Sequence, residues 1–163
     1  RMARLSIPQL PSYAAEAIAR HQVEAPGKLG AIANELGVKV VISDLPLAVS
    51  GMLVLDKDDG KSWTIKVNRH EHRNRQRFTI AHEIAHYVLH RDVIGNELVD
   101  DTFYRSGLSE QREWEANALA AEILMPWHLI TEIMRGGERD VEKLAEALQV
   151  SPAAMNIRLG VLT

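Results

Sequence analysis

The 163-residue chain contains no cysteine, which excludes disulfide bridges and thiolate metal sites. Any metal must therefore be held by histidine and carboxylate side chains. No apolar run reaches the length of a membrane span and no signal peptide is visible, so we expect a cytoplasmic protein with no membrane partner. Arg1 precedes Met2, and we expect it to be an addition to the natural chain.

The chain also has few aromatic residues and no large excess of either charge. Aromatics make up 5% of the chain, and the formal net charge of −3 provides no general attraction to nucleic acid or anionic membranes. Hydrophobic residues at 46% and charged residues at 25% are ordinary for a globular protein. The length predicts one domain over residues 1–163. The patterns described next divide this domain into N-terminal helices and sheet (1–67), the helices of a candidate metal site (68–126) and a helical C-terminal segment (127–163).

The N-terminal part has the patterns of two helices followed by a small sheet. Helices are predicted over residues 11–21 and 27–36, where Gly37 is a stop signal. The β-branched run 38–42 predicts a strand. Two further runs, 51–55 and 62–67, flank Asp58-Asp59-Gly60, which is typical of a β-hairpin. The predicted fold class is α+β, with a small sheet packed on a later helix.

That helix contains an H-E-x-x-H motif from His82 to His86. Residues four apart lie on one helix face, so both imidazoles can reach one zinc ion. Glu83 can then act as a general base on a water molecule bound at the metal. The flanking apolar residues recur at helical spacing, which supports a helix with a buried stripe: Phe78, Ala81, Ala85, Val88 and Leu89.

A third ligand must come from another segment. His90 continues the spacing, but eight helical residues rise about 12 Å, so it is expected to cap the helix end instead. The segment 109–126 predicts a second helix, with Ser109 as N-cap, on which Glu113 heads a face of small residues. Glu113 is therefore the predicted third ligand, with Glu110 as the fallback one turn earlier.

The helical repeat also predicts which way three other side chains of this second helix point. Asn117 lies one turn beyond Glu113 and could hydrogen-bond a ligand histidine. Glu115 and Glu122 are expected to point away from this face. A solvated first-turn position for Glu113 is the alternative to its role as a ligand.

The two motifs together resemble the ImmA/IrrE family of zinc metallopeptidases. The resemblance rests on R-x-R-F-T-I-A-H-E-I-A-H-Y-V-L-H and E-W-E-A-N-A-L-A-A-E-I-L-M-P, and it extends from Asn68 to about Leu162. It implies a zincin-like core, zinc held by His82, His86 and Glu113, and Glu83 as the catalytic base. It also implies that the strand at 62–67 lies at a sheet edge and holds the substrate backbone.

Two segments near the motif are predicted to be loops. The run 69–77 holds four arginines and two histidines, and a solvated loop is favoured over a contact with phosphate or an acidic peptide. The segment 91–108 is expected to be a loop over the cleft. Within it, Tyr104 could donate a hydrogen bond to a developing oxyanion, or could be an ordinary half-buried tyrosine.

The C-terminal stretch 141–159 resembles a helix-turn-helix. Its second helix offers few polar side chains, and four basic residues balance four acidic ones from Arg135 to Thr163, so direct DNA binding is not expected. We expect it to pack on the core or to dock a protein partner.

The leading hypothesis is a zinc-dependent endopeptidase. The resemblance suggests that its substrate is a helix-turn-helix repressor of the XRE type, cleaved in a stress response or mobile element. The alternative is a non-proteolytic toxin or anti-repressor module that binds a repressor-like antitoxin, with zinc in a structural role. A DNA-binding regulator is a third and weaker interpretation.

Overall fold

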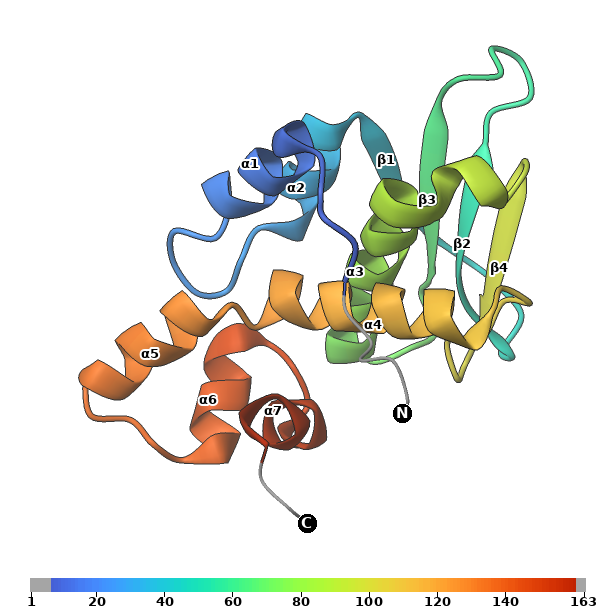
Figure 1. Ribbon diagram of the computed structural model, residues 1–163. Coiled ribbons are helices and arrows are strands. Elements are labelled where there is room, and N and C mark those ends of the chain that lie inside the picture. The colour runs from blue at the N-terminus through green and yellow to red at the C-terminus, as the bar shows by residue number, and fades with distance from the viewer. Residues whose placement is uncertain (1–6, 161–163) are drawn as a thin grey trace, which may run out of the picture.

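The computed structural model describes residues 7–160 and begins with two short helices, α1 (Ser12–Arg20) and α2 (Leu29–Leu36) (Figure 1). Both agree with the predicted helices. Gly37 ends α2 with a φ of 84°, a left-handed conformation that glycine adopts without a steric penalty. The expectation about Arg1 lies outside the described residues.

Four strands form one sheet in the order β1-β3-β2-β4. The predicted strands are present as β1 (Val38–Ser43), β2 (Val49–Leu55) and β3 (Trp63–Asn68), and β2 and β3 form the predicted antiparallel hairpin. Strand β1 pairs with β3 in parallel. Because β3 lies between β1 and β2, the prediction that residues 62–67 form a free substrate-binding edge was wrong.

The edge beside β2 is instead occupied by β4 (Glu97–Asp101), which pairs antiparallel with β2. The expectation of a loop over residues 91–108 was therefore wrong for its middle part, where Leu98 and Asp100 are buried and alternate with exposed Glu97 and Val99. A short 3₁₀ turn, Arg91–Val93, leads into this strand. Residues 102–109 form no helix or strand.

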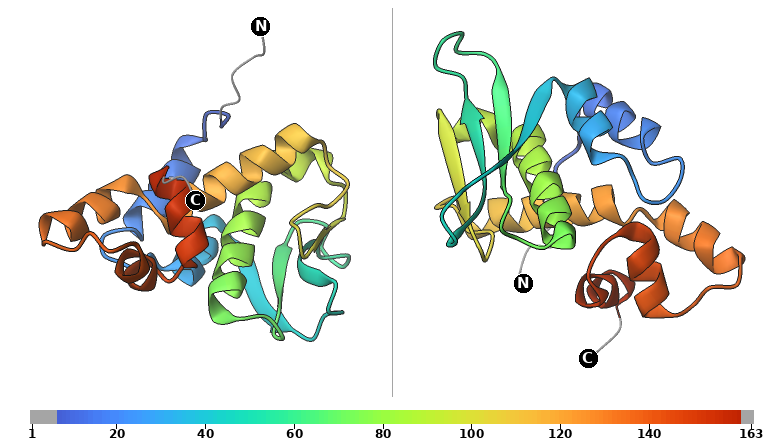
Figure 2. Two further views of the ribbon diagram at one scale, coloured as in Figure 1. Left: turned by 90° about the horizontal axis from the view of Figure 1, so that it is seen from below. Right: turned by 180° about the vertical axis from the view of Figure 1, so that it is seen from behind.

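Helix α3 (Arg73–His90) packs on one face of the sheet, and α4 (Glu110–Leu124) runs across α3 (Figures 1 and 2). Ile84 of α3 and Leu53 and Ile65 of the sheet are fully buried in the core. The prediction of a solvated loop over 69–77 was wrong from Arg73 onward. There the chain is already helical, and the His72 side chain accepts a hydrogen bond from the Asn74 amide as an N-cap.

Three helices follow: α5 (Trp127–Arg135), α6 (Val141–Leu148) and α7 (Pro152–Leu159). They lie together at one end of α4 (Figure 1). Ser151 caps α7 by accepting a hydrogen bond from the Ala154 amide, and Pro152 occupies its first position. The α+β class with a sheet on the motif helix is confirmed, whereas the division into three parts and the likeness to a helix-turn-helix stay predictions. Within residues 7–160, no helix is long and apolar enough to cross a membrane.

Candidate metal centre

The motif residues of α3 face the interior. His82, Glu83 and His86 are completely buried. The two histidines are one helical turn apart, and their Nε2 atoms lie 3.0 Å from each other. Two donors that bind one zinc ion tetrahedrally at about 2.0 Å lie about 3.3 Å apart, so this spacing suits a shared ion.

Glu113 of α4 lies opposite this pair. Its Oε1 atom is 2.9 Å from His86 Nε2, although the contact lacks the geometry of a hydrogen bond, and Oε1 has no other partner. Ser106 donates a hydrogen bond of 3.3 Å to the other carboxylate oxygen. The predicted N-cap is present, since Ser109 accepts from the Arg112 amide. The fallback, Glu110, is exposed and takes no part in this group.

The outer nitrogens of both histidines have partners that define their protonation. His82 Nδ1 lies 2.9 Å from Asn117 Oδ1, the contact predicted from sequence, and an amide oxygen can only accept. His86 Nδ1 lies 2.9 Å from His90 Nδ1. With protons on both Nδ1 atoms, the two Nε2 atoms present lone pairs to each other, which is the arrangement of paired metal-binding imidazoles.

His90 and Glu115 differ from their predicted roles. His90 is the last residue of α3, but its ring is buried and its Nε2 atom lies 2.8 Å from Glu115 Oε1. Glu115 is buried and faces α3, so the expectation that it points away was wrong. Residues two apart on α4 can both reach α3 because the two helices cross closely over their small side chains. The pair formed by His90 and Glu115 therefore supports the His86 ring on its Nδ1 side.

The site gathers several buried carboxylate oxygens, which fits a cation. Among the described residues, Glu83 Oε1 and Oε2, Asp100 Oδ2 and Glu113 Oε1 are buried oxygens with no hydrogen-bond partner. Donor atoms of His82, Glu83, His86 and Asp100 lie within 4.8 Å of one another. This group omits Glu113, but the 2.9 Å approach of Glu113 to His86 places it at the same site.

The electrostatics of the metal-free site follow from burial. Burial raises the pKa of Glu83 well above its ordinary value, and the neighbouring carboxyl groups of Asp100 and Glu113 raise it further. Burial also lowers the pKa of His86. A neutral imidazole is the form that binds a metal.

Asp100 was missed as a site residue. It is completely buried on β4, and its Oδ1 atom lies 3.3 Å from His82 Nε2. The alternation of residues 97–100 was the available signal, because an aspartate at an inward strand position needs a buried partner.

Tyr104 lies beside the metal centre and not among its donors. Its φ of 57° is left-handed, an unusual conformation for a bulky residue, and its hydroxyl lies 3.2 Å from Thr79 Oγ1. Its ring centroid is 5.0 Å from that of His82 and 4.8 Å from that of Phe78. The loop after β4 thus places a phenol next to the first motif histidine.

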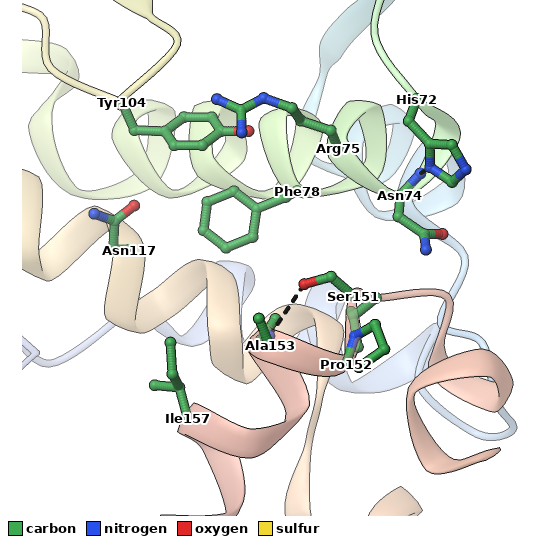
Figure 3. Close-up of a pocket in the computed structure, with 12 residues that line it drawn as sticks. His72, Asn74, Arg75, Phe78, Tyr104, Asn117, Ser151, Pro152, Ala153 and Ile157 are labelled. Carbon is green, nitrogen blue, oxygen red and sulfur yellow. Dashed lines mark hydrogen bonds between the residues drawn. The ribbon is translucent and has the colours of Figure 1, made fainter. Parts of the chain in front are cut away.

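A groove of about 660 Å³ begins at these rings (Figure 3). Phe78, Tyr104 and Asn117 line the end next to His82. The opposite wall comes from the start of α7 and includes Pro152 and Ala153, as well as the strongly exposed Ile157. The groove therefore runs from the rings beside His82 to the start of α7.

A sequence model of the M78 peptidases, described as the IrrE N-terminal-like domain, matches residues 33–160. The chain belongs to this family. The predicted resemblance to ImmA/IrrE proteins is thereby confirmed. Membership of a family of metallopeptidases implies a divalent metal, for which the buried centre of this IrrE-like domain offers the donors.

Proteins similar to this chain include a bacterial metalloprotease and a transcriptional regulator of known structure. The radiation response metalloprotease IrrE of Deinococcus radiodurans is 36% identical over 93 residues, which are 55% of this chain and 28% of that protein. The solved structure of a Mycobacterium tuberculosis transcriptional regulator matches 92% of this chain and 46% of its own, with a TM-score of 0.57 and 18% identity, which shows a shared fold. The domain thus spans less than half the length of either protein.

Proposed function

We propose that this IrrE-like domain is a zinc-dependent endopeptidase. The observation that carries the proposal is the convergence of donor atoms from His82, His86 and Glu113 beside the unpartnered carboxylate of Glu83. Two imidazoles and one carboxylate are the donor set of catalytic His₂Glu zinc sites. Imidazole-rich sites suit zinc better than magnesium or calcium.

In this proposal, His82, His86 and Glu113 hold the ion and Glu83 is the base. A bound zinc ion lowers the pKa of a water molecule and polarises the carbonyl group of a peptide. Glu83 has two oxygens without partners, so it can take a proton from that water and pass it to the leaving amine. Tyr104 is placed to donate a hydrogen bond to the oxyanion if its hydroxyl leaves Thr79.

We propose a protein substrate, and specifically a helix-turn-helix repressor of the XRE type encoded nearby. The groove supports a polypeptide substrate, because it is open to solvent along the exposed Ile157 side chain and ends at Phe78, Tyr104 and Asn117, which contact His82. The repressor is suggested by the family resemblance alone. Such a substrate would place the reaction in the cytoplasm.

A second candidate is a non-proteolytic module that binds a repressor-like antitoxin. The buried carboxylate of Asp100 favours it, since a site with four protein donors is typical of structural zinc. In that case the groove would hold the partner without cleaving it.

Co-expression with the repressor-like protein encoded beside this gene tests both candidates. Intact-mass analysis would compare the wild type with Glu83→Gln, in which the base is lost and the metal donors remain. Fragments formed only by the wild type would support the endopeptidase and locate the cleaved bond. An intact partner that co-purifies with both proteins would support the binding module and contradict cleavage.

A further inference from the structure

Asp100 is a buried carboxylate at the metal centre with no role in the proposed chemistry. It has no exposed surface, and its Oδ2 atom has no partner. We propose that Asp100 is a fourth protein donor to the metal and closes the site in the resting protein. This inference rests on the metal centre of the proposed function.

The contact between Asp100 and His82 supports this role. Asp100 Oδ1 lies 3.3 Å from His82 Nε2, the same nitrogen that lies 3.0 Å from His86 Nε2. Because Asn117 Oδ1 takes the proton of His82 Nδ1, the neutral ring presents only a lone pair to Asp100. A lone pair and a carboxylate oxygen at this distance repel each other unless a proton or a metal cation lies between them, and a cation shared with His86 and Glu113 also uses their free donor atoms.

Strand β4 presents the carboxylate to the centre in the resting structure. Asp100 occupies an inward position of β4 and lies opposite Gly51 of β2. The ladder between β2 and β4 shifts register between Val49 and Gly51, where β2 has one extra residue, Ser50. Asp100 is therefore held by sheet pairing at an inward position of β4, directly beside this irregularity.

A fourth protein donor has a consequence for function. A catalytic zinc site keeps one position for water, whereas a site with four protein donors is closed. Asp100 must then leave the metal before Glu83 can act on a water molecule. Strand β4 pairs with the sheet on one side only, so its position can change without breaking a second ladder.

Metal affinity is the first test. The metal-free protein would be titrated with Zn²⁺ against a chromogenic chelator, for the wild type, Asp100→Asn and Asp100→Ala. Loss of a group that hydrogen-bonds a metal ligand weakens metal binding about 10- to 100-fold, so loss of a direct donor should cost at least about 100-fold. Glu97→Gln, an exposed carboxylate on the same strand, is the matched control and should bind as the wild type does.

An open coordination position is the second test, on the Co²⁺-loaded protein with azide as the probe. Azide should leave the visible spectrum of the wild type unchanged and should alter that of Asp100→Ala, whose site has a free position. Thermal melts of the metal-free proteins would show that both variants fold. Equal Zn²⁺ affinity of wild type and Asp100→Asn, or the same azide response of wild type and Asp100→Ala, would overturn the inference.

Neither measurement uses a substrate, so the two proposals can fail separately. A wild type that binds no Zn²⁺ would remove the proposed peptidase together with this inference. A wild type that binds Zn²⁺ tightly, cleaves its partner and is matched by Asp100→Asn in affinity would refute only the role of Asp100.

Discussion

His90 Nε2 donates a hydrogen bond of 2.8 Å to Glu115 Oε1, which joins the last residue of α3 to the first half of α4. His90 in turn accepts the Nδ1 proton of His86, so a buried chain of contacts runs from a carboxylate to the proposed metal donor. The side-chain amide of Gln111 donates a hydrogen bond of 3.4 Å to the other carboxylate oxygen of Glu115. The arrangement orients His86 from a second helix.

Glu115→Gln should therefore weaken Zn²⁺ binding about 10- to 100-fold, because the amide supports the His90 ring less well than a carboxylate. Chelator competition measures this affinity. Glu110→Gln is the matched control, since Glu110 is an exposed glutamate on the same helix. Equal affinities for the two variants would show that the chain of contacts does not act on the metal.

Gly51 leaves space for the proposed base. A Cβ atom there would collide with Thr79 Cγ2, and it would lie 3.1 Å from Lys66 O and 3.2 Å from Glu83 Oε2. Gly51→Ala should destabilise the protein by about 1–3 kcal/mol in urea unfolding and displace Glu83.

Gly30→Ala provides the opposite case, because no atom lies within 4 Å of the added Cβ in α2. It should stabilise the protein by up to about 1 kcal/mol. If both variants changed stability equally, the close approach at Gly51 would not be the cause.

The raised pKa of Glu83 predicts how the stability of the metal-free protein depends on pH. The unfolded chain loses this proton near pH 4.5, while the buried, carboxylate-rich site keeps it bound to a higher pH. The contribution to stability is therefore complete below pH 4.5 and is lost as the pH rises toward the raised value.

Urea unfolding with EDTA present would measure the free energy of unfolding across this range. It should fall with rising pH in the wild type and fall less in Glu83→Gln, which has no carboxyl proton at this position to lose. Parallel curves for the two proteins would contradict the assignment.

Tyr104→Phe tests the proposed oxyanion contact. Loss of a single oxyanion donor costs about 10²- to 10³-fold in kcat, and KM and Zn²⁺ affinity should stay unchanged because the hydroxyl is not a donor to the metal. Tyr13→Phe, which removes a hydroxyl from a half-exposed tyrosine of α1, is the control. An unchanged kcat would leave Tyr104 with the role of lining the groove.

Ile157→Glu tests the groove as the substrate channel. The side chain is 81% exposed at the α7 wall, so the charge should cost little stability but should oppose an apolar substrate segment. We expect KM for the partner found by co-expression to rise about tenfold, which corresponds to about 1.4 kcal/mol of binding. Val23→Glu, exposed in the loop after α1, should leave KM unchanged.

The metal helices could be predicted from the sequence because their signals are local. The i, i+4 spacing of His82 and His86 and the cap at Ser109 lie within single helices, and the proposed ligand Glu113 was predicted from the small residues beside it. Asn117 followed from the same helical repeat and makes the predicted contact with His82.

The errors concern relationships between separate segments. The pairing of β1 with β3 places β3 inside the sheet, and the pairing of β2 with β4 brings Asp100 to the site. Neither pairing could be predicted, because the sequence of a single strand does not indicate which strand lies beside it. Glu115 was assigned to the wrong face because a helical projection does not show how closely α4 crosses α3. The start of α3 was missed because arginines and histidines on a helix surface have the same composition as a solvated loop.

The groove draws its two walls from distant parts of the chain. The proposed metal donors and the wall that contains Phe78 come from residues 72–117, whereas the opposite wall comes from residues 150–157. Mutations in the later segment can therefore reshape the proposed recognition surface while the buried donors stay intact. Homologues could acquire new targets by exchanging α7 alone, and an engineered graft of that helix would be a direct route to retargeting the domain.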